Sequence, residues 1–210
     1  MWISVIGSIG VGKKRISDQI AQKEGATYFE DFVYDELQDK FVKEPQTYAM
    51  DWQVYILTEK FKQQIDMSKR SRTATVVTSR LLEDIKIFSK MLRHFELMSN
   101  RDYQIIREIY YSYQEALEPP SIVILLKADI MSTWYMKELT ENVCAFTDNT
   151  YIKWLNDEYE ALAERIAVPM VEVDMSENFD QNWKIIEAGI ASVRTTGLTQ
   201  ETLWTKKLLR

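Results

Sequence analysis

The chain has very few of the residues on which several kinds of protein site depend. Of its 210 residues, one is cysteine and one is histidine. A lone Cys144 excludes an internal disulfide and a cysteine-based metal cluster, so we expect it to be a small buried hydrophobic residue. A lone His94 argues against a histidine-rich metal site and against Ser-His-Asp chemistry, so we expect it at or near the surface.

The chain also lacks an excess of positive charge and long apolar runs. Its 32 Asp and Glu outnumber its 26 Lys and Arg, which gives a net charge of −6 and no expected basic face for nucleic acid. No apolar run approaches the length of a bilayer span, and the apolar residues 1–7 run directly into a glycine loop, as a strand does. We expect no nucleic-acid partner, no transmembrane segment, and a location in the cytoplasm or on the mitochondrial matrix side.

Glycine and proline are scarce, and no repeat or linker divides the sequence, so residues 1–210 are expected to form a single domain. Short β-branched runs alternate with longer segments whose apolar residues recur every three or four positions. Strands are expected at 2–6, 27–29, 73–78, 121–126 and 168–173, and helices at 11–24, 46–67, 82–98, 100–117, 151–166 and 178–193. This alternation predicts an α/β fold, a three-layer αβα sandwich around a parallel sheet.

A phosphate-binding motif follows the first expected strand. Residues 7–13 (GSIGVGK) match the G-x-x-x-x-G-K core of the Walker A motif and open the first helix. Gly7, Gly10 and Gly12 would let the backbone wrap so that its N–H groups, at a helix N-terminus, point at phosphate oxygens. Lys13 would reach the β- and γ-phosphates. The motif predicts a P-loop NTPase-like fold that binds ATP or another nucleotide.

The next position departs from the motif. A serine or threonine hydroxyl normally ligates Mg²⁺ there, but this chain has Lys14. An ammonium cannot ligate a metal, and at ~4 Å with an effective dielectric constant near ~20 it would repel one by about 4 kcal/mol per unit charge. Mg²⁺ binding is therefore doubtful and no metal site is predicted, whereas Lys14 could still help to hold phosphate.

Further short motifs are spread over nearly the whole chain. They are residues 28–30 (YFE), 44–49 (EPQTYA), 52–57 (WQVYIL), 81–84 (LLED), 87–90 (IFSK), 99–103 (SNRDY) and 151–159 (YIKWLNDEY). No one of them is specific, but their order and spacing resemble the deoxynucleoside kinase family, particularly the short bacterial deoxyadenosine and deoxyguanosine kinases. The resemblance implies strand order 2-3-1-4-5 and transfer of the ATP γ-phosphate to the 5′-hydroxyl of a deoxynucleoside.

The resemblance also assigns roles on the nucleoside side. Glu30 would be the general base near the 5′-hydroxyl, unless it is a solvated carboxylate at a strand end. Gln53 would pair with the nucleobase edge, unless it is an exposed helical glutamine. Asp84 would shape the base pocket, unless it is a surface charge. Three aromatic residues would pack against sugar and base, or fill the core: Tyr48, Trp52 and Phe88.

The phosphate side departs from the family pattern at two further places. The family's acidic-Arg-Ser or acidic-Arg-Thr triplet falls on residues 78–80 (TSR), where a one-residue deletion would restore Arg80 as a catalytic group but would leave Ser79 in place of the acid. The family's arginine-rich lid corresponds to residues 135–146, which contain no arginine. Lys137 is a point charge and cannot copy the planar fork of an arginine.

With the metal hydroxyl, the acid and the lid arginines all altered, the first expectation is a degenerate kinase. Such a pseudokinase would bind a nucleoside or nucleotide, or would serve as a structural subunit, and the family offers a precedent in an accessory subunit of respiratory complex I. Its protein partner would be a second copy, a paralogous kinase subunit or a large assembly. The alternative is an active deoxynucleoside kinase.

Overall fold

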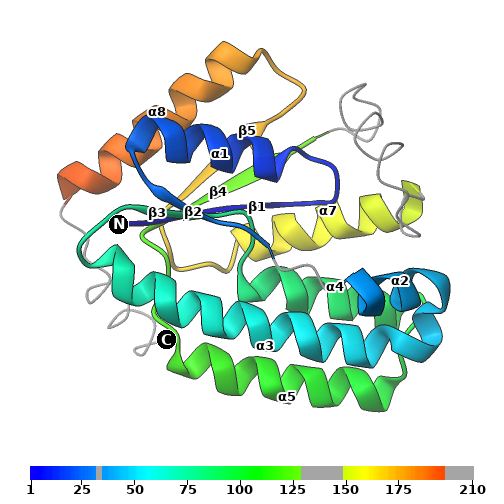
Figure 1. The fold of residues 1–210 in the computed structure, drawn as a ribbon. Coiled ribbons are helices and arrows are strands. Elements are labelled where there is room, and N and C mark those ends of the chain that lie inside the picture. The colour runs from blue at the N-terminus through cyan, green and yellow to red at the C-terminus, as the bar shows by residue number, and fades with distance from the viewer. Residues whose placement is uncertain (32–34, 129–148, 197–210) are drawn as a thin grey trace.

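The computed structural model describes residues 1–31, 35–128 and 149–196 and shows a parallel sheet between two helical layers (Figure 1). The strands are β1 (Trp2–Gly7), β2 (Thr27–Phe29), β3 (Val76–Thr78), β4 (Ile122–Lys127) and β5 (Met170–Asp174). Each strand pairs with its neighbours in parallel, in the order β2-β3-β1-β4-β5. The predicted fold class and strand order are confirmed.

The helices divide between the two faces of this sheet. One face is covered by α1 (Lys13–Glu24) and α8 (Phe179–Thr196). The other is covered by α3 (Pro45–Ser71), α4 (Leu82–His94), α5 (Asn100–Ala116) and α7 (Asn149–Ala163), with α2 (Asp35–Lys43) packed beside α3. Burial on both faces explains why β1 and β4 read as continuous apolar runs.

Side chains of β1 alternate between two hydrophobic cores. Trp2 and Ile6 belong to the core beneath α3, α4, α5 and α7, whereas Ile3 and Val5 belong to the core beneath α1 and α8. All six residues of β1 are buried. The strand therefore holds both layers together, and its end places the glycine loop at the carboxyl edge of the sheet.

The apolar face of α5 lies in the core rather than on a free surface. Tyr103, Ile106, Tyr110 and Leu117 are each less than 10% exposed. Tyr113 is half-buried and packs against the same core. The apolar residues of this face are therefore used in packing against the rest of the chain.

One helix was not expected, and several of the expected helices end at other residues, for example α3 at Ser71 rather than at 67. Helix α2 was not predicted: it is a short helix in which Leu37 and Phe41, four residues apart, face the core. Helix α4 ends at His94 rather than at 98, because Glu96 adopts a positive φ of 59° that terminates the helix. His94 is exposed, as expected, and stacks on Trp154.

Two predictions fall on parts of the chain that lie outside the described residues. The arginine-free lid segment, residues 135–146 with Lys137, is one of them, and Cys144 lies within it. In the described portion of the chain, every helix is too short or too polar to cross a bilayer.

Candidate functional site

The glycine loop between β1 and α1 adopts a conformation that its glycines make possible. Gly7, Gly10 and Gly12 all have positive φ, and a Cβ on Gly7 would lie 2.5 Å from the carbonyl oxygen of Leu126. Lys13 Nζ donates hydrogen bonds to the carbonyl oxygens of Gly7 and Ser8, at 2.8 and 2.6 Å. The loop therefore surrounds the N-terminus of α1, where backbone N–H groups favour an anion.

Glu30 and Lys14 form an ion pair on the surface. Lys14 Nζ lies 3.2 Å from Glu30 Oε1, and the two side chains are 68% and 67% exposed. The expected general base thus contacts the residue that replaces the metal-binding hydroxyl of the motif. With an ammonium at this position, the side chains of the loop do not fit a directly ligated Mg²⁺.

Asp31 occupies a more enclosed position than Glu30. Its Oδ1 lies 2.9 Å from Lys60 Nζ, and its Oδ2 lies 3.1 Å from Arg80 Nε. Ser79 Oγ also donates a hydrogen bond to Oδ2, at 3.2 Å. Burial alone would raise the pKa of the Asp31 carboxyl, but the charges of Arg80 and Lys60 outweigh it and hold that pKa well below its ordinary value.

The parallel register of β2 and β3 explains this arrangement. Phe29 is the Cα partner of Thr78, so the residues that follow the two strands leave the sheet side by side. Asp31 comes beside Ser79 and Arg80 as a result. A carboxylate from the segment after β2 thus lies beside Ser79, the position where the sequence has no acid.

A cavity of about 170 Å³ opens between the glycine loop and helices α2, α3, α4 and α7. Gly7, Lys13 and Arg80 line it on the side of the glycine loop, and Trp52 and Phe88 also line it. Contact of these two aromatic residues with a nucleoside stays a prediction. Its other lining residues are Ile9, Gln38, Phe41, Val42, Ile56, Asp84, Ile85, Leu155 and Tyr159. Helix α2, which the sequence did not predict, thus completes one wall, where Phe41 stacks on Trp52.

Asp84 is a buried carboxyl group rather than a surface charge. It is 5% exposed, and it accepts hydrogen bonds from the Tyr159 hydroxyl at 2.6 Å and from the Leu81 N–H at 2.7 Å. Burial raises the pKa of Asp84, and burial also raises the pKa of Tyr159 well above its ordinary value. Asp84 therefore joins the start of α4 to α7 at the floor of the cavity.

Gln53 and Tyr48 stand outside the residues that line this cavity. Gln53 is completely buried, so the alternative of an exposed helical glutamine is wrong. Its Oε1 accepts a hydrogen bond from Ser89 Oγ at 2.9 Å, while its Nε2 has no partner in the described part of the chain. Tyr48 is half-buried against the core. Their contact with a nucleobase or a sugar stays a prediction.

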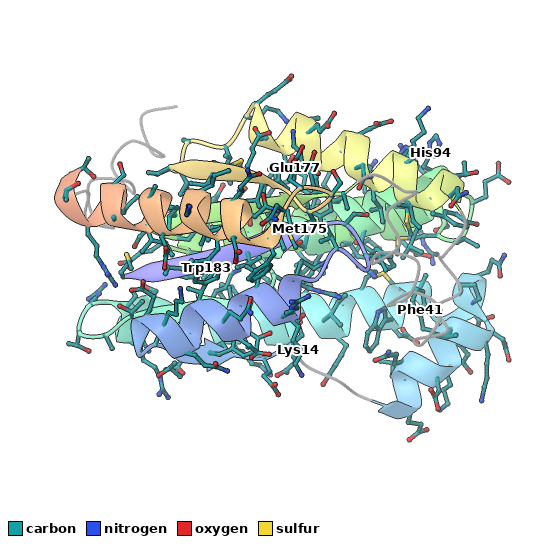
Figure 2. The ribbon with its side chains drawn as sticks, turned by 90° about the horizontal axis from the view of Figure 1, so that it is seen from above. Lys14, Phe41, His94, Met175, Glu177 and Trp183 are labelled. Carbon is teal, nitrogen blue, oxygen red and sulfur yellow. The ribbon has the colours of Figure 1, made fainter. Side chains whose placement is uncertain are left out.

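The sequence reasoning missed Asp31 and Lys60. A signal for Lys60 was available, because α3 buries polar residues at helical spacing: Gln53, Lys60 and Gln64 lie on the same buried side as Leu57 and Met67. A lysine on such a face needs a carboxylate partner. Asp31 was overlooked because the adjacent Glu30 matched the family motif. Directly after β5, Met175 lies near the glycine loop, with its Cε 3.9 Å from where a Cβ on Gly12 would be (Figure 2).

Comparison with known proteins agrees with the geometry. A model of the deoxynucleoside kinase family matches residues 3–196. A deoxyadenosine kinase of Dictyostelium discoideum is 24% identical over 200 residues, which are 91% of this chain and 80% of that protein. A deoxyadenosine/deoxycytidine kinase of Bacillus subtilis (strain 168) is 27% identical over 133 residues, which are 61% of this chain and 60% of that protein.

Solved structures show the same fold. A deoxyadenosine kinase from M. mycoides, solved with the products dCMP and a flexible dCDP, superposes with a TM-score of 0.78 at 22% identity. The same enzyme with bound dCTP superposes with a TM-score of 0.76 at 22% identity. Each match covers 91% of this chain and 100% of the other. Since the family model spans nearly the whole sequence and the fold agrees, this chain belongs to the deoxynucleoside kinase family.

Proposed function

We propose that the chain is a deoxynucleoside kinase that transfers the γ-phosphate of ATP to the 5′-hydroxyl of a deoxynucleoside. The observation that carries the proposal is the cavity shared by Lys13 and Arg80 on one side and by Trp52, Phe88 and Asp84 on the other. A nucleoside in this cavity would direct its 5′ end toward the phosphate loop. The named relatives are kinases of this family, which favours the active alternative over the degenerate kinase that the altered motifs suggest.

Each side of the cavity has a distinct task in this proposal. The backbone N–H groups of the loop and Lys13 would hold the β- and γ-phosphates of ATP. Arg80, a planar cation at the junction, would hold the 5′ end and neutralise charge on the transferred group. Trp52 and Phe88 would stack on the nucleoside, and Asp84 would fix the base.

Two carboxylates are candidates for the general base. Glu30 was expected from the motif, but its side chain is exposed and paired with Lys14. Asp31 is held in place between Lys60 and Arg80, although the same two cations lower its pKa and so make it a weaker proton acceptor. Arg80 links it directly to the cavity. We favour Asp31, because a base must be held in place before the hydroxyl proton can transfer to it.

No step of the proposed reaction depends on a metal ion ligated by the side chains of the loop. Lys14 places a fixed positive charge beside the loop where the motif would place a metal ligand. This charge can bind phosphate, although it cannot bridge two phosphate oxygens as a metal ion does. Asp31, which accepts a hydrogen bond from Ser79, would replace the missing acid and so compensate for one of the three alterations.

The test is a direct assay of phosphoryl transfer. The purified protein is incubated with ATP, with and without Mg²⁺, and with each of the four deoxynucleosides, and the monophosphate is separated and counted. We expect product with at least one deoxynucleoside, reduced by about 100-fold or more in Lys13→Ala, because the lysine contacts the transferred phosphate. Absence of product with all four substrates would contradict the proposal.

The second candidate is a nucleotide-binding subunit without transfer activity. The ion pair between Lys14 and Glu30 favours this second candidate. In that one contact, the residue that stands in place of the metal ligand binds the carboxylate that was expected to act as the base. In that case calorimetry would detect a deoxynucleoside or its phosphates while the transfer assay gave no product. Such a subunit would act with a second copy, a paralogous kinase subunit or a larger assembly, and co-purification from the host would identify which.

A further inference from the structure

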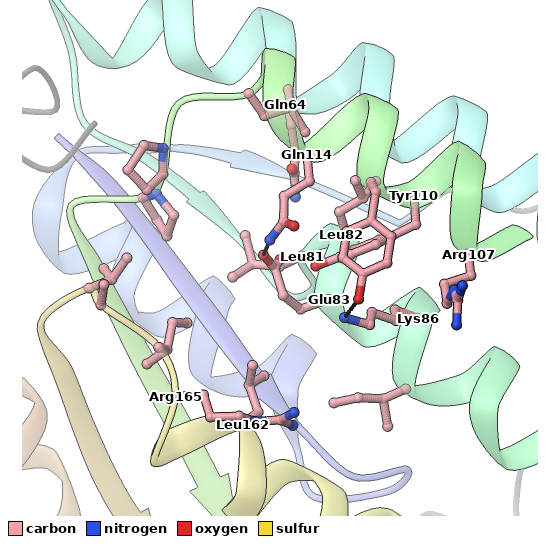
Figure 3. A pocket seen from close by; sticks show the side chains of 18 of the residues that line it. Gln64, Leu81, Leu82, Glu83, Lys86, Arg107, Tyr110, Gln114, Leu162 and Arg165 are labelled. Carbon is pink, nitrogen blue, oxygen red and sulfur yellow. Dashed lines mark hydrogen bonds between the residues drawn. The ribbon is translucent and has the colours of Figure 1, made fainter. Parts of the chain in front are cut away.

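A second and larger cavity lies at the opposite end of the sheet from the glycine loop. Its volume is about 550 Å³, and it is enclosed by α3, α4, α5 and α7 (Figure 3). Its floor is formed where strands begin: by Trp2 at the start of β1, by Pro120 before β4 and by Val168 before β5. The glycine loop, by contrast, follows the end of β1. This cavity is therefore separate from the candidate kinase site.

Buried hydrogen-bond donors in this cavity have no acceptor. Trp2 is fully buried and Gln64 is 3% exposed, yet Trp2 Nε1 and Gln64 Nε2 have no hydrogen-bond partner in the described portion of the chain. Arg107 Nε shares this condition. Figure 3 shows Gln64 directed from α3 toward the interior of the cavity. An unsatisfied buried donor is costly, so three around one cavity indicate that acceptors are missing there.

The charges around the cavity are unequally paired. Its carboxylates are engaged: Glu158 pairs with Lys90, Glu118 pairs with Arg72, and Glu83 accepts a hydrogen bond from Gln114. Two of its cations, Lys86 and Arg165, make no ion pair with a carboxylate of the described residues.

Contacts other than ion pairs hold these two cations in place. Lys86 lies over the rings of Tyr110 and Tyr111, and Arg165 Nε donates to a backbone carbonyl. What the cavity lacks is thus an acceptor with negative charge. Aromatic and aliphatic walls from Tyr103, Tyr110 and Leu162 lie around it.

We propose that this cavity binds a small aromatic organic acid, a flat apolar body that carries a carboxylate or a similar anionic group. The apolar body packs against the tyrosine and leucine side chains. The acid group accepts from Gln64 Nε2, and Lys86 and Arg165 favour its charge. The apolar walls and few convergent polar groups are typical of small-molecule sites.

The first turn of α4 connects this cavity with the candidate kinase site. Glu83 lines the large cavity, and the next residue, Asp84, lines the nucleoside cavity. Glu158 and Tyr159 of α7 divide between the two cavities in the same way. A ligand in the large cavity therefore contacts the same two helices that position Asp84.

The test uses two matched fluorescent probes on the whole chain. One is 8-anilinonaphthalene-1-sulfonate, an aromatic acid, and the other is N-phenyl-1-naphthylamine, which has the same ring system without the sulfonate. We expect the acid to bind at one site per chain and more tightly than the neutral probe. Equal affinity for the two probes would overturn the acidic character of the ligand.

Single substitutions locate the site. Gln64→Leu should weaken the acidic probe by about tenfold or more, because it removes a donor to an anionic group. The melting temperature of the Gln64→Leu variant should equal or exceed that of the wild type, since the substitution removes a buried donor that has no partner. Gln19→Leu is the matched control: Gln19 also has a buried unpaired amide atom, but it lies on α1 away from the cavity. If both variants weaken the probe equally, the site is not this cavity.

Two further measurements complete the test. Lys86→Met should weaken the acidic probe several-fold and leave the neutral probe unchanged, and Leu162→Trp should fill the cavity and abolish binding of both. Sedimentation equilibrium across the same protein concentrations checks the other occupant, a second copy of the chain. If probe binding decreases at the protein concentrations at which the dimer forms, a second copy of the chain covers the cavity, and the proposal is overturned.

Discussion

Lys60 and Asp31 form an ion pair in which the lysine is almost completely buried: Nζ lies 2.9 Å from Oδ1, and the Lys60 side chain is 4% exposed. The pair joins the middle of α3 to the end of β2, 29 residues apart in sequence. Lys60 Nζ also donates to Gln63 Oε1, at 2.8 Å. Burial lowers the pKa of Lys60, against the stabilising effect of the Asp31 carboxylate.

Loss of the Asp31 carboxylate should therefore destabilise the protein strongly. Asp31→Leu leaves a buried ammonium with its carboxylate partner removed, and we expect a loss of about 3–5 kcal/mol in the free energy of unfolding. The double variant Asp31→Leu/Lys60→Met should recover most of that loss. Urea denaturation measures each value, and Asp66→Leu, which removes the exposed partner of Arg70, should cost less than about 1 kcal/mol.

The same carboxylate predicts how stability depends on pH. The pKa of Asp31 is lower in the folded chain than in the unfolded chain, so its contribution is present above the unfolded value of about 4 and is lost as the pH falls toward the folded value. Wild type and Asp31→Asn should differ most in unfolding free energy above about pH 4, and the difference should shrink in more acid solution. A difference that is constant from neutral to acid pH would contradict the pKa direction.

The two candidate bases are separated by conservative substitutions. If Asp31 takes the hydroxyl proton, Asp31→Asn should lower kcat by about 100-fold or more, whereas Glu30→Gln should lower it by less than about tenfold. The measurement is steady-state transfer to the preferred deoxynucleoside, at a temperature where both variants are folded by circular dichroism. The reverse order of effects would assign the role to Glu30.

Lys14 should make nucleotide binding nearly independent of Mg²⁺. The wild-type chain carries an ammonium where the motif would ligate the metal, so the increase in melting temperature on adding ATP should be similar with and without Mg²⁺. Lys14→Ser should gain a dependence on Mg²⁺ and lose affinity for metal-free ATP. If Mg²⁺ strongly increases the stabilisation of the wild type by ATP, the metal binds without a ligand from residue 14.

Gly7 should tolerate no side chain. Its φ is 146°, and an added Cβ would meet the Leu126 carbonyl oxygen at 2.5 Å, so Gly7→Ala must displace backbone at the end of β1. Gly25, with φ of 59° and no atom within 4 Å of an added Cβ, is the matched control. Gly25→Ala should cost about 1 kcal/mol, the strain of positive φ alone, and Gly7→Ala should cost clearly more. Equal losses by thermal denaturation would mean that the loop adjusts.

The sheet was predictable because each strand and helix carries its own periodicity. The buried runs at β1 and β4 and the glycine loop between β1 and α1 were recognisable without tertiary information. Helix α2 was not, because it has only nine residues and its apolar side chains find their contacts on α3 and α4 in the folded chain. The contact of Asp31 with Lys60 and Arg80 was also not predictable. It depends on the register of β2 with β3, and on the position of α3, which carries Lys60, relative to the ends of these two strands.

Glu83 and Asp84 face different cavities because successive helical residues point about 100° apart. An insertion or deletion of one residue in the first turn of α4 would rotate the charges: a carboxyl group would leave the nucleoside cavity, and its neighbour would lose contact with Gln114. The register of this turn, and not only the identity of its two acids, therefore decides which carboxyl group each cavity receives.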